Sequence, residues 1–232
     1  MYLKGVLCLL ALYQVHCYEK WDEGLGPLYK LNAVKDTFLE RYGKSYDRPS
    51  FGQLLIGKHP SYPIKRILIQ FETLPARVCP VGKIEWARIY LYFVRRHRAS
   101  WHNRQRHRAP WLDYEINVHR IKRYWQESYA RPRYRCRSCS HRAWYKPYLD
   151  LGRDAVNEPE CKKTTIYSGT PRPSWQGFDV TGSVKAWAEG APNYGVLIKV
   201  HDETTEGVDL RFWNRHHNNP NLRPYMVVQC KS

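Results

Sequence analysis

The sequence predicts a mainly β protein, an antiparallel β-sandwich or jelly roll with one short helix near residues 181–189. Two observations support this fold class. Short stretches of β-branched and aromatic residues recur along the chain, with Gly, Pro and Asn turns between them. One of these stretches, residues 84–93, alternates with a period of two, which is typical of a strand with one buried face. Many short strands separated by turn residues favour a sandwich.

We predict seven strands, at residues 66–71, 84–93, 115–121, 164–167, 195–200, 209–213 and 224–229. In the second of them the alternation assigns the two faces directly. The buried face holds Ala87, Ile89, Leu91 and Phe93, and the opposite face holds Trp86, Arg88, Tyr90 and Tyr92. The sandwich domain is expected to span residues 51–232.

The short helix follows from apolar residues at helical spacing. Val180, Val184 and Trp187 lie at positions i, i+4 and i+7. Asp179 or Thr181 can cap its first turn, and Gly190 can end it. We expect Trp187 to close one end of the sandwich.

Residues 18–50 form a lead-in segment with a different pattern. Leu31, Val34, Phe38 and Tyr42 fall at helical spacing with charged residues between them. This pattern predicts one short amphipathic helix that packs on the main domain. A mobile arm is the alternative.

The first seventeen residues resemble a cleavable signal peptide. Lys4 is followed by an apolar run, VLCLLALY, and then by a short polar segment ending at Cys17. The run is too short for a membrane-spanning helix, which needs roughly 20 apolar residues. We therefore expect a secreted, extracellular protein, with cleavage either before or after Cys17.

The positive charge is concentrated in one part of the chain. The formal net charge is +17. Residues 95–142 hold fourteen Lys and Arg against three acidic residues, a net of +11. Such a concentration costs self-repulsion and favours an anionic partner. For a secreted protein we expect an acidic polysaccharide or another extracellular polyanion rather than nucleic acid, with matrix proteins as further candidate partners.

A basic loop at residues 94–111 is the candidate binding site. Guanidinium groups match carboxylate and sulfate groups with two hydrogen bonds each, and flat indole rings can stack on sugars. A solvated loop or a site of proteolytic processing is the alternative. The candidate ligand-binding residues are Arg95, Arg96, Arg98, Trp101, Arg104, Arg106, Arg108 and Trp111.

Five cysteines remain after cleavage behind Cys17, and we regard all of them as disulfide candidates: Cys79, Cys136, Cys139, Cys161 and Cys230. Their odd number leaves one thiol over, or pairs it with another chain. Cys136, Cys139, His141 and Cys161 could instead supply four zinc ligands. An oxidising compartment favours a disulfide, for example from Cys136 or Cys139 to Cys161. We expect no metal and no cofactor.

Several segments together resemble one domain family. The segments are WQGFDVT at 175–181, VKAW at 184–187 and NYG at 193–195, with RILIQF at 66–71, LP at 74–75, IEWARIYL at 84–91 and RPYMVV at 223–228. Taken in their order along the chain, these segments resemble the disaggregatase-related (DNRLRE) β-sandwich domains. A weaker similarity connects them with the propeptides of TGF-β-type growth factors, although no cystine-knot ligand follows in this sequence. The first resemblance implies a secreted, non-catalytic binding or structural module, since some such domains bind uronic-acid polysaccharides. The basic loop departs from the family pattern.

Other constellations suggest weaker hypotheses. Trp125, Trp175, Trp187 and Trp213 could form a sugar platform, with Trp187 assigned to the core by its spacing. The acidic residues near a strand connection, Asp202, Glu203, Glu206 and Asp209, could bind calcium, but a solvated turn is the simpler interpretation.

No common catalytic motif is present. The leading hypothesis is therefore a non-catalytic module that binds an anionic extracellular polymer. A structural protein of an extracellular or biomineral matrix is the second, and a polysaccharide lyase using His, Tyr and Arg is the third.

Overall fold

The structure is a computed structural model that describes residues 25–40, 52–59, 62–96, 114–166, 173–204 and 208–232. Within these ranges the chain forms ten strands and one α-helix. The strands are β1 (Leu25–Leu39), β2 (Gln53–His59), β3 (Tyr62–Phe71), β4 (Ile84–Arg96), β5 (Tyr114–Arg120), β6 (Cys161–Ile166), β7 (Ser174–Asp179), β8 (Val196–Val200), β9 (Val208–Trp213) and β10 (Tyr225–Lys231). The helix is α1 (Thr181–Ala188), and short 3-10 turns lie at Val81–Lys83 and Pro220–Leu222.

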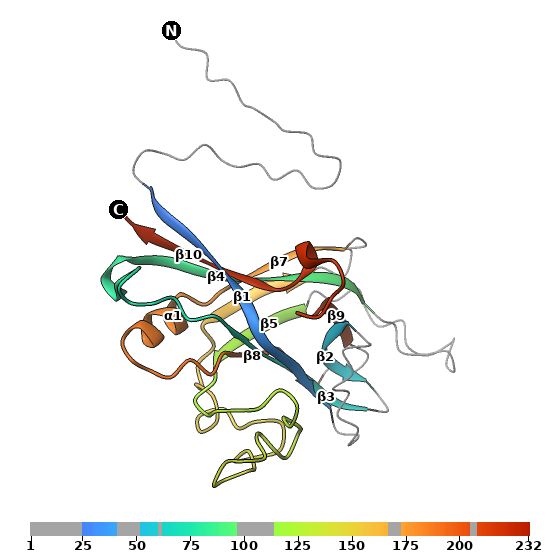
Figure 1. Cartoon of the computed structure of the whole chain (residues 1–232). Coiled ribbons are helices and arrows are strands. Elements are labelled where there is room, and N and C mark those ends of the chain that lie inside the picture. The colour runs from blue at the N-terminus through green and yellow to red at the C-terminus, as the bar shows by residue number, and fades with distance from the viewer. Residues whose placement is uncertain (1–24, 41–51, 60–61, 97–113, 167–172, 205–207) are drawn as a thin grey trace.

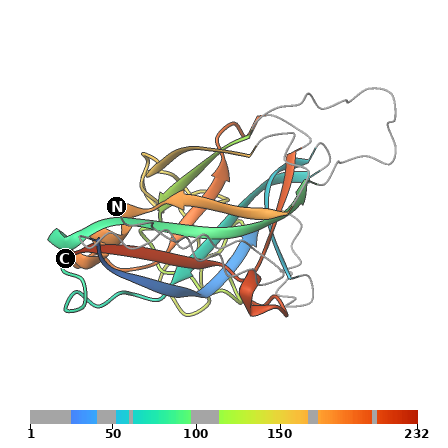
Figure 2. The same ribbon diagram turned by 90° about the horizontal axis from the view of Figure 1, so that it is seen from above.

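The strands are antiparallel and hydrogen-bond into one continuous sheet, which folds over so that its two halves face each other, as expected for a β-sandwich (Figure 1). We call these halves the first and the second sheet; they are joined where β2 pairs with β3. In the first sheet β4 lies between β10 and β7. The last residues of β4 pair with β9, and β9 in turn pairs with β2. Seen from above, β7, β4 and β10 run side by side (Figure 2). The second sheet runs from β3 through β8 and β5 to β6. All seven segments predicted as strands lie in or overlap these strands.

Strand β1 belongs to both sheets. Its first half pairs with β10 and its second half pairs with β3. The register shifts between Ala33 and Lys35, where the strand passes from one sheet to the other. The amphipathic helix predicted around Leu31–Tyr42 is therefore wrong, because residues 31–39 are part of β1. The predicted signal peptide lies outside the described residues.

The main core fills the space between the two sheets. Ile89 and Leu91 of β4 face Ile67 and Ile69 of β3, and all four are buried almost completely. Trp187 of α1 belongs to the same core, as the sequence predicted. Burial of such side chains stabilises the fold by about 1.5–3 kcal/mol each.

The N-terminus of helix α1 is held by carboxylates from two separate segments of the chain. The carboxylate of Asp179 accepts a hydrogen bond from the amide of Thr181 at 3.0 Å. The carboxylate of Glu160, which directly precedes β6, accepts from both the amide and the hydroxyl of Ser183, at 2.6 and 2.7 Å. Orphan amides at a helix N-terminus are thereby satisfied. Gly190 follows the helix with a φ of +103°, a usual helix end.

A long connection, residues 121–160, leaves β5 and returns to β6. We call it the excursion; it lies below β5 and β8 in Figure 1. It covers the outer face of the second sheet with a second core, in which Trp125 and Trp144 pack with Leu68 of β3 and Leu197 of β8. No pattern in the sequence predicted this layer.

Candidate functional site

The outer face of the first sheet carries a group of aromatic rings from three strands. Tyr90 and Tyr92 of β4 point outward, as the period-two pattern predicted. The register places Tyr225 of β10 and Gly177 of β7 on either side of Tyr90, and Trp175 of β7 beside Tyr92. Tyr90, Tyr92, Trp175 and Tyr225 form the aromatic strip.

The rings of the aromatic strip contact one another directly. Tyr90 and Tyr225 stack at 19° with their centroids 5.1 Å apart. Trp175 meets Tyr225 edge-on at 5.0 Å and Tyr92 at 5.2 Å. A Cβ on Gly177 would lie 3.2 Å from the ring of Tyr90, so the glycine leaves room for that ring. The four side chains are only half-buried, so part of each side chain is accessible to solvent.

Two cations flank the aromatic strip on the same face. Lys30 of β1 and Arg88 of β4 both pair in register with Val227, so they lie in the next row of the sheet. The ammonium group of Lys30 is 4.4 Å from the ring centroid of Tyr225, and the guanidinium of Arg88 is 5.3 Å from that of Trp86. Both side chains are exposed. Rings that stack and cations that attract carboxylates therefore share one surface.

The basic loop begins where this surface ends. Arg95 and Arg96 are the last residues of β4, and they pair in register with Arg211 and Leu210 of β9. The remaining predicted ligand-binding residues lie outside the described residues: Arg98, Trp101, Arg104, Arg106, Arg108 and Trp111.

The four tryptophans considered for a sugar platform do not come together. Trp125 and Trp187 are buried in two different cores. Trp213 packs on His217, with centroids 4.2 Å apart. Only Trp175 belongs to the aromatic strip, where its neighbours are tyrosines.

Among the described residues, the cysteines form two disulfides, Cys79–Cys230 and Cys136–Cys139. Pairing of Cys136 or Cys139 with Cys161 was therefore a wrong expectation. Cys136 and Cys139 lie in one tight turn with their Cα atoms 5.8 Å apart, whereas Cys161 opens β6 opposite Val118. Because both thiols of the turn are used, the four-ligand zinc alternative is also excluded.

A charged junction holds the excursion against β1 and the loop after β9. The guanidinium of Arg215 donates two hydrogen bonds to the carboxylate of Glu127, at 2.8 and 2.6 Å. The amide of Arg215 donates to the buried carboxylate of Asp36 at 2.6 Å, and the amide of Asp36 donates to Glu127 at 2.9 Å. Burial raises the pKa of Asp36 to about 7. Burial also raises the pKa of Glu127, but the hydrogen bonds from Arg215 and Asp36 lower it by more. The pKa of the Glu127 carboxyl therefore lies below its ordinary value.

This junction also contains donor atoms that a metal ion could use. Ligand atoms of Asp36, Glu127 and His216 lie within 4.8 Å of one another. Both oxygens of Glu127 already accept hydrogen bonds from Arg215, however, and a cation there would compete with that guanidinium. The arrangement fits an ionic junction better than a metal centre.

The acidic residues considered for calcium are engaged otherwise. Glu203 accepts two hydrogen bonds from the guanidinium of Arg66, both at 2.7 Å, and lies 3.6 Å from the ammonium group of Lys199. Asp202 accepts from the amide and hydroxyl of Thr204. Glu206 and the side chain of Asp209 lie outside the described residues. Within the described part, these carboxylates belong to local ion pairs and turns.

Sequence reasoning found only part of the aromatic strip. It placed Tyr90 and Tyr92 on one face by their alternation, but it missed Lys30, Tyr225 and the cluster as a whole. Their meeting depends on the pairing of β1, β10 and β7 with β4, and no local pattern encodes that register.

Within the described residues, no helix has both the length and the apolar character needed to cross a membrane. No protein-family model matches the chain, and no curated protein matches it.

Proposed function

We propose that this chain is a secreted, non-catalytic module that binds an acidic polysaccharide. The observation that carries the proposal is the aromatic strip with Lys30 and Arg88 beside it on one exposed sheet face. Sugar rings stack on aromatic faces, and the carboxylate or sulfate groups of the same polymer attract the two cations. The resemblance to uronic-acid-binding sandwich domains and the basic sequence that follows β4 support the same partner.

The aromatic strip is tested by removing ring faces. We expect Tyr92→Ala combined with Trp175→Ala to weaken binding to alginate and heparin, by about 1 kcal/mol or roughly fivefold for each ring lost. Tyr92→Phe is the matched control, because it keeps the ring and should keep the affinity. Isothermal titration calorimetry measures both, and the melting temperature of each variant reports on folding. Unchanged affinity in a folded double variant contradicts the proposed site.

The cations are tested separately. Lys30→Gln with Arg88→Gln should lower the salt concentration at which the protein elutes from a heparin column. Arg77→Gln with Lys83→Gln removes two exposed cations elsewhere and serves as the charge-matched control. An equal shift in both double variants indicates a non-specific effect of net charge and contradicts the site.

The basic loop is a further part of the proposal. Replacement of Arg95, Arg96, Arg98, Arg104, Arg106 and Arg108 by Gln should strongly lower the salt concentration at which the protein elutes from heparin, because fewer charge contacts then resist screening. Retention equal to that of the wild type excludes the loop as a contact. A lyase would instead release unsaturated sugars from these polymers. Ultraviolet absorbance after incubation of the protein with alginate or heparin detects such products.

A further inference from the structure

We propose that the excursion is a second anion-binding surface, so that one molecule bridges two polysaccharide chains. This inference rests on the proposed function and adds a separate contact on the opposite side of the sandwich. It makes the chain a cross-linking protein and not only a binding one.

The excursion presents arginines that no carboxylate of the described residues neutralises. Residues 128–149 contain no acidic residue. Arg133, Arg137 and Arg142 are exposed, and none of them forms an ion pair with a carboxylate of the described residues. Exposed Tyr134 and Tyr145, with 43% and 58% of their surface accessible, add ring faces to the same segment.

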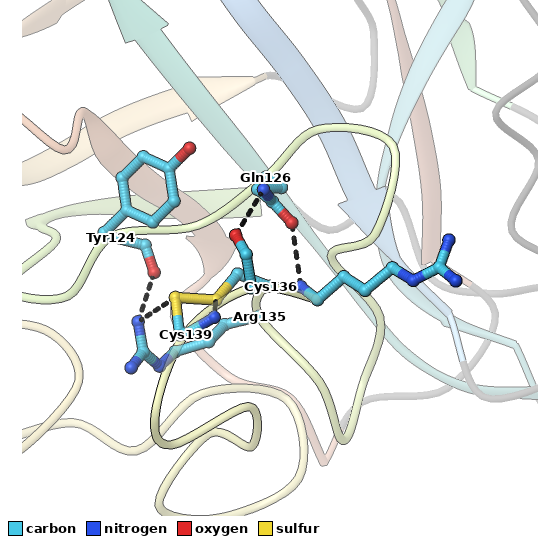
Figure 3. Close-up of a disulfide and its surroundings, with 7 residues drawn as sticks. Tyr124, Gln126, Arg135, Cys136 and Cys139 are labelled. Carbon is cyan, nitrogen blue, oxygen red and sulfur yellow. Dashed lines mark hydrogen bonds between the residues drawn. A yellow bond between two sulfur atoms is a disulfide. The ribbon is translucent and has the colours of Figure 1, made fainter.

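The backbone that carries these arginines is held from inside. The Cys136–Cys139 disulfide, drawn in Figure 3, closes a turn whose sequence includes Arg137. Next to it the guanidinium of Arg135 is turned inward, where it donates to the carbonyl of Tyr124 at 2.7 Å and to the sulfur of Cys139 at 3.3 Å. The backbone positions of these arginines are thus fixed, which lowers the entropy lost when a polyanion binds.

The side chain of Gln126 completes this support. Its carbonyl oxygen accepts from the amide of Arg137 at 2.8 Å, and its amide group donates to Ser138 at 3.0 Å. Its backbone amide donates to the carbonyl of Arg135 at 2.8 Å. One glutamine therefore holds the cationic turn against the segment that carries Tyr124, and Figure 3 shows hydrogen bonds of Gln126 as dashed lines.

The two surfaces lie on opposite sides of the molecule. The aromatic strip is on the outer face of the first sheet. The excursion packs on the outer face of the second sheet through Leu68 and Leu197. In Figure 1 it lies below β5 and β8. The inter-sheet core lies between them. Because neither surface covers the other, two polymer chains can bind at the same time, and linked binding sites of this kind raise the avidity for a polymer network.

The chemistry of the excursion favours a sulfated polysaccharide. Guanidinium groups match sulfate oxygens with paired hydrogen bonds. Two disulfides are typical of an oxidising compartment, where nucleic acid is scarce and sulfated polymers are common. The large exposed hydrophobic residues of this segment, Tyr124, Tyr134 and Tyr145, are tyrosines, which suit sugar rings better than a lipid interior.

Bridging is measured by light scattering when the protein is titrated with soluble heparin. We expect the wild type to give a maximum at an intermediate ratio, where each molecule joins two chains. The triple variant Arg133→Gln, Arg137→Gln, Arg142→Gln should still bind heparin but lose most of the scattering. The control variant Arg77→Gln, Lys83→Gln, Lys185→Gln removes the same charge and should scatter like the wild type. Scattering by the triple variant that equals the control overturns the inference.

Calorimetry with short heparin oligosaccharides separates the two surfaces. We expect two sites per wild-type molecule, and one site in the triple variant and in the Tyr92→Ala, Trp175→Ala variant. A single site in the wild type overturns the inference. If the strip variant keeps two sites while the triple variant loses one, the proposed function of the strip fails but the excursion site stands.

Discussion

Asp36 has an environment that opposes its ionisation. It is 5% exposed, and its pKa is raised to about 7 from 3.8, first by burial and then by the neighbouring carboxylate of Glu127. The folded state thus binds a proton more tightly than the unfolded state does. The stability contributed by this proton is complete below about pH 3.8 and is lost as the pH rises through about 7. At about pH 8 the loss is on the order of 4 kcal/mol.

Asp36→Asn removes this ionisation and keeps an oxygen that can accept from the amide of Arg215. We expect the melting temperature of the variant, relative to the wild type, to rise between about pH 5 and about pH 8, because only the wild type pays for ionisation at the higher pH. Differential scanning calorimetry across this range measures it. A difference that stays constant with pH contradicts the raised pKa.

Gly195 illustrates a position where only glycine fits. Its φ is +78°, and a Cβ there would lie in contact with the carbonyl oxygen of Ile69 and 2.7 Å from the Cα of Gln70. Asn193 fixes the same turn, since its side chain accepts from the amide of Gly195 at 3.0 Å and donates to the carbonyl of Phe71 at 3.1 Å. This explains the NYG segment of the sequence as turn chemistry.

Gly195→Ala should therefore lower the free energy of unfolding by about 3 kcal/mol or more, because β3 and β8 have to separate. Gly82→Ala is the matched control, since nothing lies within 4 Å of the added carbon, and it should change stability by less than about 1 kcal/mol. Urea denaturation compares the two. Similar losses in both variants would contradict the steric argument.

At the scale of elements, β1 shows why a strand was taken for a helix. Leu31 and Ala33 pack toward the main core before the register shift, and Phe38 does so after it. The bulge changes which residues point inward, so the apolar positions 31 and 38 fall seven residues apart, as on a helix. Regular strands such as β4 keep their alternation and were predicted correctly. The bulge follows from pairing with two different strands, which no local window of sequence contains.

The two disulfides should differ in their effect on stability. Cys79–Cys230 closes a loop with a sequence separation of 151, and Cys136–Cys139 one of 3. In the chain-entropy model, their removal costs about 5 and about 2 kcal/mol. We expect Cys79→Ser with Cys230→Ser to lower the melting temperature of the whole domain more than Cys136→Ser with Cys139→Ser does. The reverse order in thermal unfolding would contradict this account.

At the scale of the whole molecule, charge is the dominant feature. A net charge of +17 on one chain repels itself in the compact state. We expect the melting temperature to rise when sodium chloride increases from about 10 mM to about 150 mM, because screening weakens this repulsion. A neutral osmolyte at the same osmolality is the control. A melting temperature that falls with added salt would show that attractive ion pairs, such as Arg215–Glu127, outweigh the repulsion.

The residue types of the candidate surfaces could be predicted from the sequence, but their places in the fold could not. The excess of arginine between residues 95 and 142 pointed to an anionic partner. The sequence could not show that part of it, the excursion, packs on the second sheet through Trp125 and Trp144. Nor could it show which tyrosines meet Trp175. Both depend on contacts between residues that are far apart along the chain.

The pairing of β1 with β10 also determines how the domain responds to pulling. Leu25 pairs with Lys231, so tension applied beyond these two residues opens the strands from that end, one hydrogen bond after another, instead of shearing all of them together. Such unzipping resists little force. Cys230 lies where this unzipping starts. The Cys79–Cys230 disulfide transfers the force to the turn before β4. In a stretched network the disulfide thus acts as a mechanical stop: β1 can peel away while the rest of the sandwich stays folded.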